Sequence, residues 1–178
     1  MNPIFISLLL LQAIPEVEGE STELSEQIEI IEEKPDPVTG EFAVDPYPQT
    51  NENAGAKPFG GANMSIQFGG KDGIRKITDR LVDLSIDDPR ISEIFKGQDM
   101  VRLRRTLFEQ FCYILAAGCD YSGRDMRSAH ADMGLERKDL NALVENLQRA
   151  MEEQDIAFST QNKFLAKLAP MDADVLQK

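Results

Sequence analysis

Apolar residues recur at intervals of three and four along most of the chain from Gly73 onward, the spacing that places side chains on one face of an α-helix. Proline at position 89 predicts the end of the first such segment. No stretch of alternating β-branched residues predicts a strand. The sequence therefore predicts an all-α domain of four or five helices, compatible with several helical architectures. The apolar spacing predicts helices within residues 74–84, 100–115, 140–151 and 164–168.

The first residues follow a different pattern. Residues 4–11 form an apolar run that is too short to span a bilayer and that resembles the hydrophobic region of a secretory signal. Cleavage after Gly19 is compatible with the small residues nearby, although no basic residue precedes the run. We therefore expect residues 1–19 to be a signal or apolar leader and the protein to be exported or periplasmic. The alternative is an uncleaved segment that packs or sits in a membrane, or a cytoplasmic protein.

Residues 20–62 are rich in acidic residues, proline, glycine and asparagine, with few large apolar side chains. Such a segment cannot bury enough surface to offset its chain entropy. The sequence predicts an acidic, disordered linker here, most simply a solvated tether and less often a docking segment. A short amphipathic turn is possible at 24–31. The helical domain is then expected at residues 63–178.

The charge and the rare residues narrow the functional classes. The formal net charge is −12, and residues 1–70 hold 12 acidic residues against two lysines. A general binder of nucleic acid or of anionic membranes needs a basic surface, so both are excluded. One histidine excludes sites that need two imidazoles from the chain, and two cysteines are too few for a Cys-based zinc site.

The lone histidine lies in a short segment with helical spacing. Ser122 and Asp125 predict an N-terminal cap, and Gly134 predicts a stop. Between them, His130 shares one apolar face with Met126 and other residues, so its ring nitrogen needs a partner. That partner is either a hydrogen-bond acceptor or a metal, and the residues alone leave both open.

Several short motifs keep a common spacing over residues 66–175, and together they resemble group I truncated haemoglobin, the two-over-two globin family. The fold expected from this resemblance is an all-α, two-over-two truncated globin with the acidic extension before it. The matching residues are Phe68-Gly69-Gly70 with Gly73-Ile74, Asp88-Pro89-Arg90, Phe95, Gly97, Asp99-Met100, Leu103, Tyr121-Ser122-Gly123, Met126, His130, Leu168-Ala169-Pro170 and Asp174-Val175.

The resemblance implies a haem site. His130 would be the axial ligand of iron in haem b, which leaves the opposite face open to a diatomic gas. Phe95 would pack on the haem, Met126 would form pocket wall, and Arg102 would pair with a propionate, with Arg105 and Arg127 as further options. No C-x-x-C-H motif is present, so the haem is expected to be bound non-covalently. The electron donor is unknown.

The sequence departs from the family pattern on the distal side. Val82 stands where well-known members carry tyrosine, and three further positions stand where they carry glutamine or another polar group. The distal side is therefore expected to be apolar, with weaker retention of O₂, unless Tyr113 or another side chain reaches in. The three positions are Leu103, Thr106 and Leu107.

Two features near residue 115 also depart from the pattern. The family's Gly-Gly is Ala116-Ala117 here, and because alanine resists left-handed geometry, the helix is expected to run on toward Gly118. Cys112 and Cys119 could be two buried thiols or a disulfide. An offshoot that this sequence resembles carries the same pair, which favours the disulfide in an exported protein.

Three functions remain at this point. The first is a haem protein that reversibly binds O₂, CO or NO. The second is a haem peroxidase or NO-detoxifying enzyme, which would need a distal acid or base that is not evident. The third is a haem-free interaction module with a globin fold.

Overall fold

The computed structural model describes residues 34–176, which belong to a compact unit from Lys34 to Lys178. The expected leader, its cleavage position and the turn at 24–31 lie outside the described residues. Within residues 34–176 the chain forms helices and irregular segments and no strand, so the all-α prediction is confirmed. None of these helices is long and apolar enough to cross a membrane.

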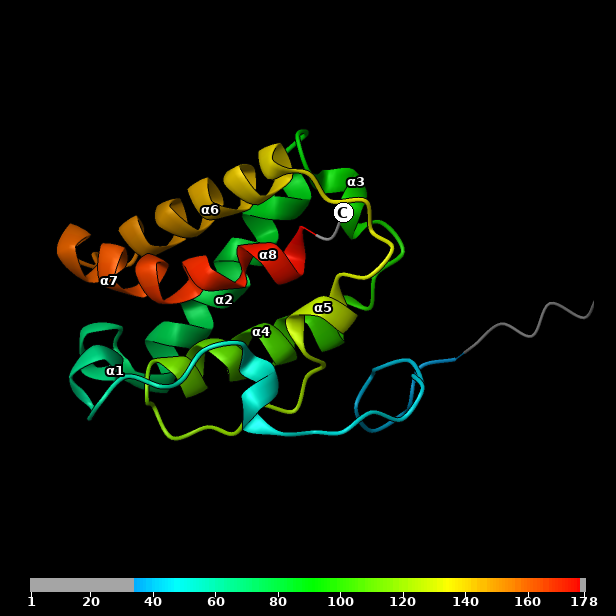
Figure 1. Ribbon diagram of the computed structural model, residues 1–178, viewed down its shortest axis with the longest axis horizontal. Coiled ribbons are helices and arrows are strands. Elements are labelled where there is room, and N and C mark those ends of the chain that lie inside the picture. Colours follow the sequence, from blue (N-terminus) through cyan, green and yellow to red (C-terminus); the bar gives the residue numbers. More distant parts are fainter. Residues whose placement is uncertain (1–33, 177–178) are drawn as a thin grey trace, which may run out of the picture. The chain divides into compact units, whose positions relative to one another are not determined.

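Four longer helices form two antiparallel pairs (Figure 1). The first pair is α2 (Gly70–Asp87) and α4 (Met100–Ile114), and the second is α6 (Arg137–Glu152) and α7 (Phe158–Leu168). Helix α2 packs against both α4 and α6, so the two pairs share one core. The shorter elements are η1 (Asn51–Ala54), α1 (Asn63–Gln67), α3 (Ser92–Phe95), α5 (Met126–Ala129), η2 (Ala169–Met171) and α8 (Asp172–Val175).

Local sequence accounts for where the long helices begin and end. Helix α2 ends at Asp87, before the predicted Asp-Pro stop. Asp99 caps α4 by accepting a hydrogen bond of 2.9 Å from the Arg102 backbone N–H. At the start of α6, the Asp139 carboxylate accepts the N–H of Glu136 at 2.9 Å.

The core lies between the helix pairs and is organised around three aromatic rings. Phe164 of α7 contacts Phe68 and Phe111 edge-on, with ring centroids 5.2 and 4.9 Å apart. Gly73 lets α2 approach this cluster, because a Cβ there would overlap the carbonyl oxygen of Phe68. The glycine of the Gly-Ile motif therefore has a packing role, whereas Gly69 and Gly70 take the left-handed conformation at φ 74° and 65°.

The end of α4 corrects one prediction, because the helix does not run on toward Gly118. It ends at Ile114, and Ala116 takes the left-handed conformation at φ 58°. Two backbone hydrogen bonds typical of a Schellman motif offset the strain: Ala116 N–H to Tyr113 at 3.0 Å and Ala117 N–H to Cys112 at 2.9 Å. Cys112 and Cys119 form a disulfide across this turn, with Cα atoms 5.6 Å apart.

The segment before His130 also differs from prediction. Asp125, not Ser122, caps α5, by accepting the Ser128 N–H at 3.0 Å. The Ser122 hydroxyl instead donates to Glu109 at 2.6 Å, which removes it from capping. Helix α5 ends at Ala129, so His130 is its C-terminal cap residue and not an interior residue.

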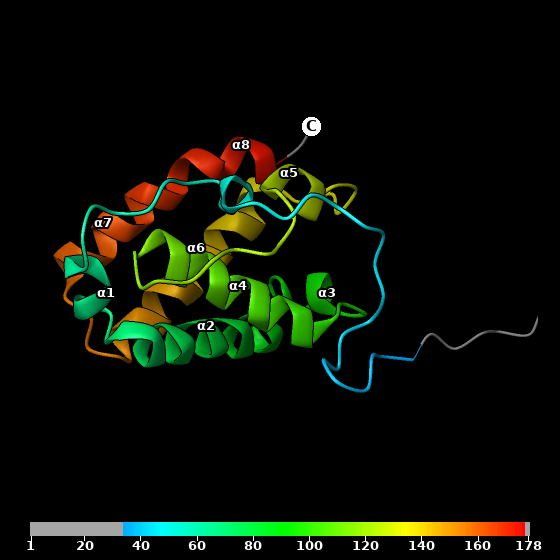
Figure 2. The same ribbon diagram turned by 90° about the horizontal axis from the view of Figure 1, so that it is seen from below.

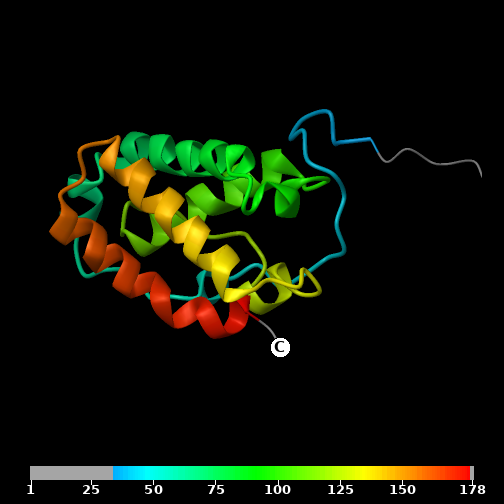
Figure 3. The same cartoon turned by 90° about the horizontal axis from the view of Figure 1, so that it is seen from above.

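The compact unit begins earlier than the predicted boundary at residue 63. Part of the segment expected to be linker, residues 34–62, lies along the helical domain and, in Figures 2 and 3, passes from the side of α3 to the side of α5. It is held by backbone and short polar groups, including the Phe59 N–H that donates to Ile114 at 2.8 Å and the Asn53 amide that donates to Gly123 at 3.1 Å. A segment without a core of its own can still dock on a neighbouring one.

Candidate functional site

A cavity of about 780 Å³ lies among α2, α3, α4, α5, α6 and α7 and is walled mainly by apolar side chains. This volume is in the range of sites that enclose a large organic ligand. All eight side chains that the sequence analysis assigned to a cofactor line this one cavity. They are Val82, Phe95, Arg102, Leu103, Thr106, Leu107, Met126 and His130.

The orientation of the imidazole is fixed by the turn that carries it. His130 Nδ1 lies 2.8 Å from the carbonyl oxygen of Met126, and the His130 N–H also points to this carbonyl, at 3.2 Å. Because a carbonyl can only accept, Nδ1 must carry the proton. In the neutral ring, Nε2 then carries no proton and holds a lone pair. This is the tautomer whose Nε2 can bind a metal.

A metal at His130 could not be held by the protein alone within the described residues. No group of three or more His, Cys, Asp or Glu side chains there could hold a metal ion. The cavity offers one imidazole and apolar walls, which fits a metal that arrives with its other ligands in a planar organic group. The donor set therefore fits haem.

The wall formed by α2 and α4 is apolar. Val82, Leu103 and Leu107 line it, and the Thr106 hydroxyl between them donates to the backbone carbonyl of Arg102 at 2.9 Å. The Thr106 hydroxyl is thus already engaged by the backbone of its own helix. Tyr113, the alternative considered from the sequence, is not among the lining residues.

The other neutral donors that line the cavity are also committed to backbone oxygens. Gln98 is the exception among the described residues, and its side chain is exposed. A small ligand inside the cavity therefore meets hydrocarbon on this side. The committed donors are Tyr47 to Ser122 at 3.0 Å, Ser85 to Leu81 at 2.8 Å, Gln110 to Ala54 at 3.0 Å and Tyr121 to Arg124 at 2.9 Å.

The arginines fall into different environments. Arg102 lines the cavity but already donates to the carbonyl of Phe42 and pairs with Asp99 at 3.4 Å. Arg105 and Arg127, the further options for a propionate, do not line it. Arg105 binds carboxylates away from the cavity, and Arg127 pairs with Asp174 at 2.8 Å.

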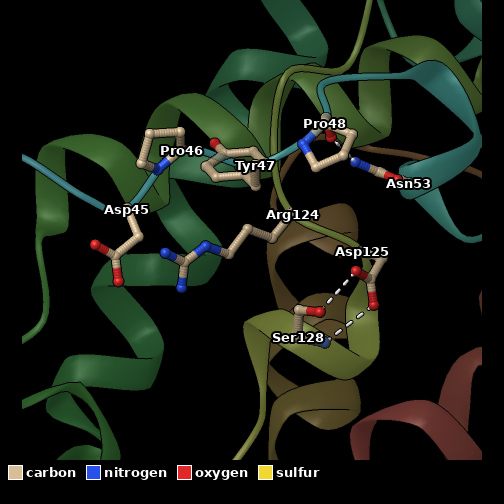
Figure 4. A pocket seen from close by; sticks show the side chains of 8 residues that line it. All are labelled: Asp45, Pro46, Tyr47, Pro48, Asn53, Arg124, Asp125 and Ser128. Atoms are coloured by element: carbon tan, nitrogen blue, oxygen red, sulfur yellow. Dashed lines mark hydrogen bonds between the residues drawn. The ribbon is translucent and has the colours of Figure 1, made fainter.

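Arg124 is a cavity residue that was not predicted from the sequence. Its side chain lines the main cavity and also a second, smaller pocket of about 310 Å³. Figure 4 shows it extended beneath the ring of Tyr47, with the guanidinium pointing toward Asp45, and its Cζ atom is 5.3 Å from the ring centroid. No ion pair of Arg124 occurs within residues 34–176. Its place directly after the Tyr121-Ser122-Gly123 motif was the available signal.

Three further lining residues come from the segment classed as linker: Phe42, Val44 and Tyr47. Isolated apolar residues in an acidic, proline-rich sequence carry no period, so pattern analysis could not find them. Beside them, the hydrogen bonds from Arg105 hold the pKa of Glu41 below its usual range, outweighing burial. Burial raises the pKa of Asp99, but hydrogen bonds from Arg102 and Phe42 N–H outweigh it, so this pKa is also lowered. Both carboxylates are therefore ionised at neutral pH.

Comparison with known proteins places this fold in one class, that of small globins. The family model for bacterial-like globins matches residues 66–177. The chain therefore belongs to the bacterial-like globin family, and its fold is the two-over-two fold of truncated globins.

Sequence and structural relatives agree with this assignment. A group 1 truncated haemoglobin of Nostoc commune is 26% identical over 111 residues, covering 62% of this chain and 94% of the relative. One from Chlamydomonas moewusii is 26% identical over 116 residues, covering 64% of this chain and 68% of the relative. The Fe(III) form of Tetrahymena pyriformis truncated haemoglobin aligns with a TM-score of 0.62 at 22% identity, over 65% of this chain and 98% of that one. The Synechococcus 2/2 haemoglobin, in the cyanomet state with covalently attached haem, aligns with a TM-score of 0.61 at 21% identity, over 65% of this chain and 98% of that one.

Proposed function

We propose that the protein binds haem b with His130 as the axial iron ligand and reversibly binds a diatomic gas on the opposite face. The observation that carries the proposal is the His130 Nδ1 to Met126 carbonyl contact, which leaves Nε2 as the free donor of the only imidazole in the chain. The haem supplies an iron atom whose remaining coordination position accepts O₂, CO or NO. The chain supplies the ligand, the walls and the exclusion of water.

The residues that would hold the haem divide into three groups. Val82, Leu103 and Leu107 provide an apolar wall on α2 and α4, while Phe95 and Met126 extend the walls. Two arginines line the cavity, and Arg124 is the better placed of them to pair with a propionate, because Arg102 already pairs with Glu41 and Asp99. Attachment would be non-covalent, because the described cysteines are joined to each other and the sole imidazole serves the iron.

The apolar wall favours gas binding over peroxidase chemistry. Peroxide cleavage needs a positioned acid or base near the distal face, and the neutral donors there are bonded to the backbone. O₂ gains from a hydrogen-bond donor more than CO does. We therefore propose weak retention of O₂ and less affected binding of CO and NO.

The test is an absorption spectrum of purified protein titrated with haem, for the native chain, His130→Gly and Met133→Leu. We expect a stoichiometric Soret band that shifts with CO in the native protein and in Met133→Leu, which removes a neighbouring thioether but not the ligand. His130→Gly should lose the five-coordinate histidine signature and regain it when imidazole is added. No saturable haem binding by the native protein would refute the proposal and leave an interaction module.

We further propose that the protein is exported, for which the Cys112–Cys119 disulfide is the structural support. Disulfides persist in oxidising compartments and are rare in the cytosol. Cell fractionation with thiol labelling tests this. An unlabelled pair in the periplasmic fraction is expected, and a reduced pair in the cytosol would contradict it.

A further inference from the structure

We propose that residues 41–47, here called the strap, form a wall of the haem site and are locked in place by Glu41. This inference rests on the proposed function for the identity of the ligand. The strap precedes the part of the chain that the family model matches, residues 66–177. It is thus an addition to the globin domain that contributes to the same cavity.

The strap is a single layer between the cavity and solvent. Phe42 and Val44 line the cavity, and yet their side chains are 40% and 44% exposed. Tyr47 lines it as well. In Figures 2 and 3 this part of the chain passes from the side of α3 to the side of α5, the helix next to His130. A ligand that leaves through this face must displace the strap.

One end of the strap is tied to α4 by buried charge. Glu41 is only 8% exposed and accepts two hydrogen bonds from Arg105, one of them at 2.9 Å. Arg102 lies 3.4 Å from the same carboxylate and donates to the Phe42 carbonyl. The Phe42 N–H donates to Asp99 at 2.9 Å. Bonds of this kind, with a charged partner, are about twice as strong as neutral ones.

The other end is tied to the chain that leads to α5. The Tyr47 hydroxyl donates to the Ser122 carbonyl at 3.0 Å, and just beyond the strap the Asn51 side chain accepts the Tyr121 N–H at 2.7 Å. The strap therefore bridges the helix that carries the distal residues and the segment that carries the axial ligand. Losing either tie opens the wall.

Both arginines that line the cavity contact the strap. Arg102 donates to Phe42, and Arg124 lies against the Tyr47 ring. A haem carboxylate that pairs with either arginine would restrain the same groups that hold the strap. We therefore expect haem to protect the strap, and the closed strap to retain haem, as two sides of one coupling free energy.

The test compares the full-length native chain with Glu41→Gln, with the wall variant Phe42→Ala/Val44→Ala, and with Glu52→Gln as a matched control. Glu52 is on the same segment, is exposed and forms no side-chain ion pair within the described residues. Haem transfer to excess apomyoglobin gives the release rate. We expect Glu41→Gln to release haem about tenfold faster, the loss of roughly one charge-assisted bond. The wall variant should also release it faster, and Glu52→Gln should match native.

Hydrogen exchange gives a second readout that does not need haem. In the haem-free chain, amides of residues 41–47 should exchange faster in Glu41→Gln than in native or Glu52→Gln, and haem should slow them in native. If Glu41→Gln released haem and exchanged its amides at the native rates, Glu41 would not hold the strap in place. If the wall variant released haem at the native rate, the strap would not be a wall of the haem site. If the native chain bound no haem, the proposed function would fail, while the exchange comparison would still decide whether Glu41 holds the strap.

Discussion

Placing a hydrogen-bond donor on the distal wall should convert a weak O₂ binder into a stronger one. The variant is Leu107→Gln, because Leu107 lines the cavity on α4 and glutamine is close to leucine in length. Native neutral donors nearby are committed: Thr106 to the Arg102 carbonyl at 2.9 Å and Gln110 to Ala54 at 3.0 Å. The new amide would thus be the first uncommitted donor on this wall.

The magnitude follows from one added hydrogen bond. O₂ carries partial negative charge when it binds ferrous haem, so a donor is worth about 1–2 kcal/mol, between a neutral and a fully charge-assisted bond. That corresponds to roughly 5- to 30-fold slower O₂ dissociation. CO carries much less charge, so its dissociation should change by less than about threefold.

The assay is stopped-flow displacement of O₂ by excess CO from the ferrous, haem-loaded protein. Leu107→Met is the matched control, since it alters shape without adding a donor. Equal O₂ dissociation rates in native, Leu107→Met and Leu107→Gln would refute the reasoning. That result would mean either that the gas does not bind against this wall or that another donor already serves it.

Three further predictions concern other parts of the molecule. Ala116→Gly should raise the free energy of unfolding by about 0.5–1 kcal/mol, because the left-handed φ of 58° suits glycine; equal or lower stability in urea melts would contradict this. Arg124→Gln should weaken haem affinity several-fold by removing a cation from the cavity, measured by haem transfer, whereas Arg127→Gln, outside the cavity, should not. The folded pKa values of Glu41 and Asp99 are lowered, so their ion pairs stabilise the fold above the usual carboxyl range and are lost as pH falls. The stability difference between native and Glu41→Gln, by urea unfolding of haem-free protein, should therefore be constant from about pH 7 to 5 and shrink below that; a constant difference down to pH 3 would contradict this.

The sequence predicted the long helices well because each buries one apolar stripe that recurs with the helical period. Its prediction at Ala116 was wrong because intrinsic preference is a small term. A Schellman pair of hydrogen bonds and a disulfide over the same turn outweigh about 1–2 kcal/mol of strain. Ser122 was assigned to a cap on local pattern, but a carboxylate thirteen residues earlier, Glu109, takes its hydroxyl. Such partners, distant in the sequence, cannot be found from local residue patterns.

In the candidate site, too, the residues on long helices were predicted from the sequence and those with non-local partners were not. Motif spacing brought eight cavity residues together, since the helices that carry them are rigid and their register is set by the core. The strap was not predicted, because the composition of a segment indicates whether it can bury a core of its own. Composition does not indicate whether the segment can pack against the core of a neighbouring domain. Phe42 and Val44 each cover one part of an existing cavity, and the bonds that hold them, such as Glu41 to Arg105 and the Tyr47 hydroxyl to Ser122, join residues far apart in the sequence.

The strap also changes which arginine is best placed for a propionate. Around Arg102 there are already two carboxylates, Glu41 at 3.4 Å and Asp99 at 3.4 Å, as well as the Phe42 carbonyl. A third carboxylate there would meet like charges and would compete for donors that the strap uses. Arg124 lines the same cavity, has no ion pair within the described residues and rests on an aromatic face. The two arginines thus have different roles: Arg102 binds the strap, and Arg124 is the cation available to pair with a propionate.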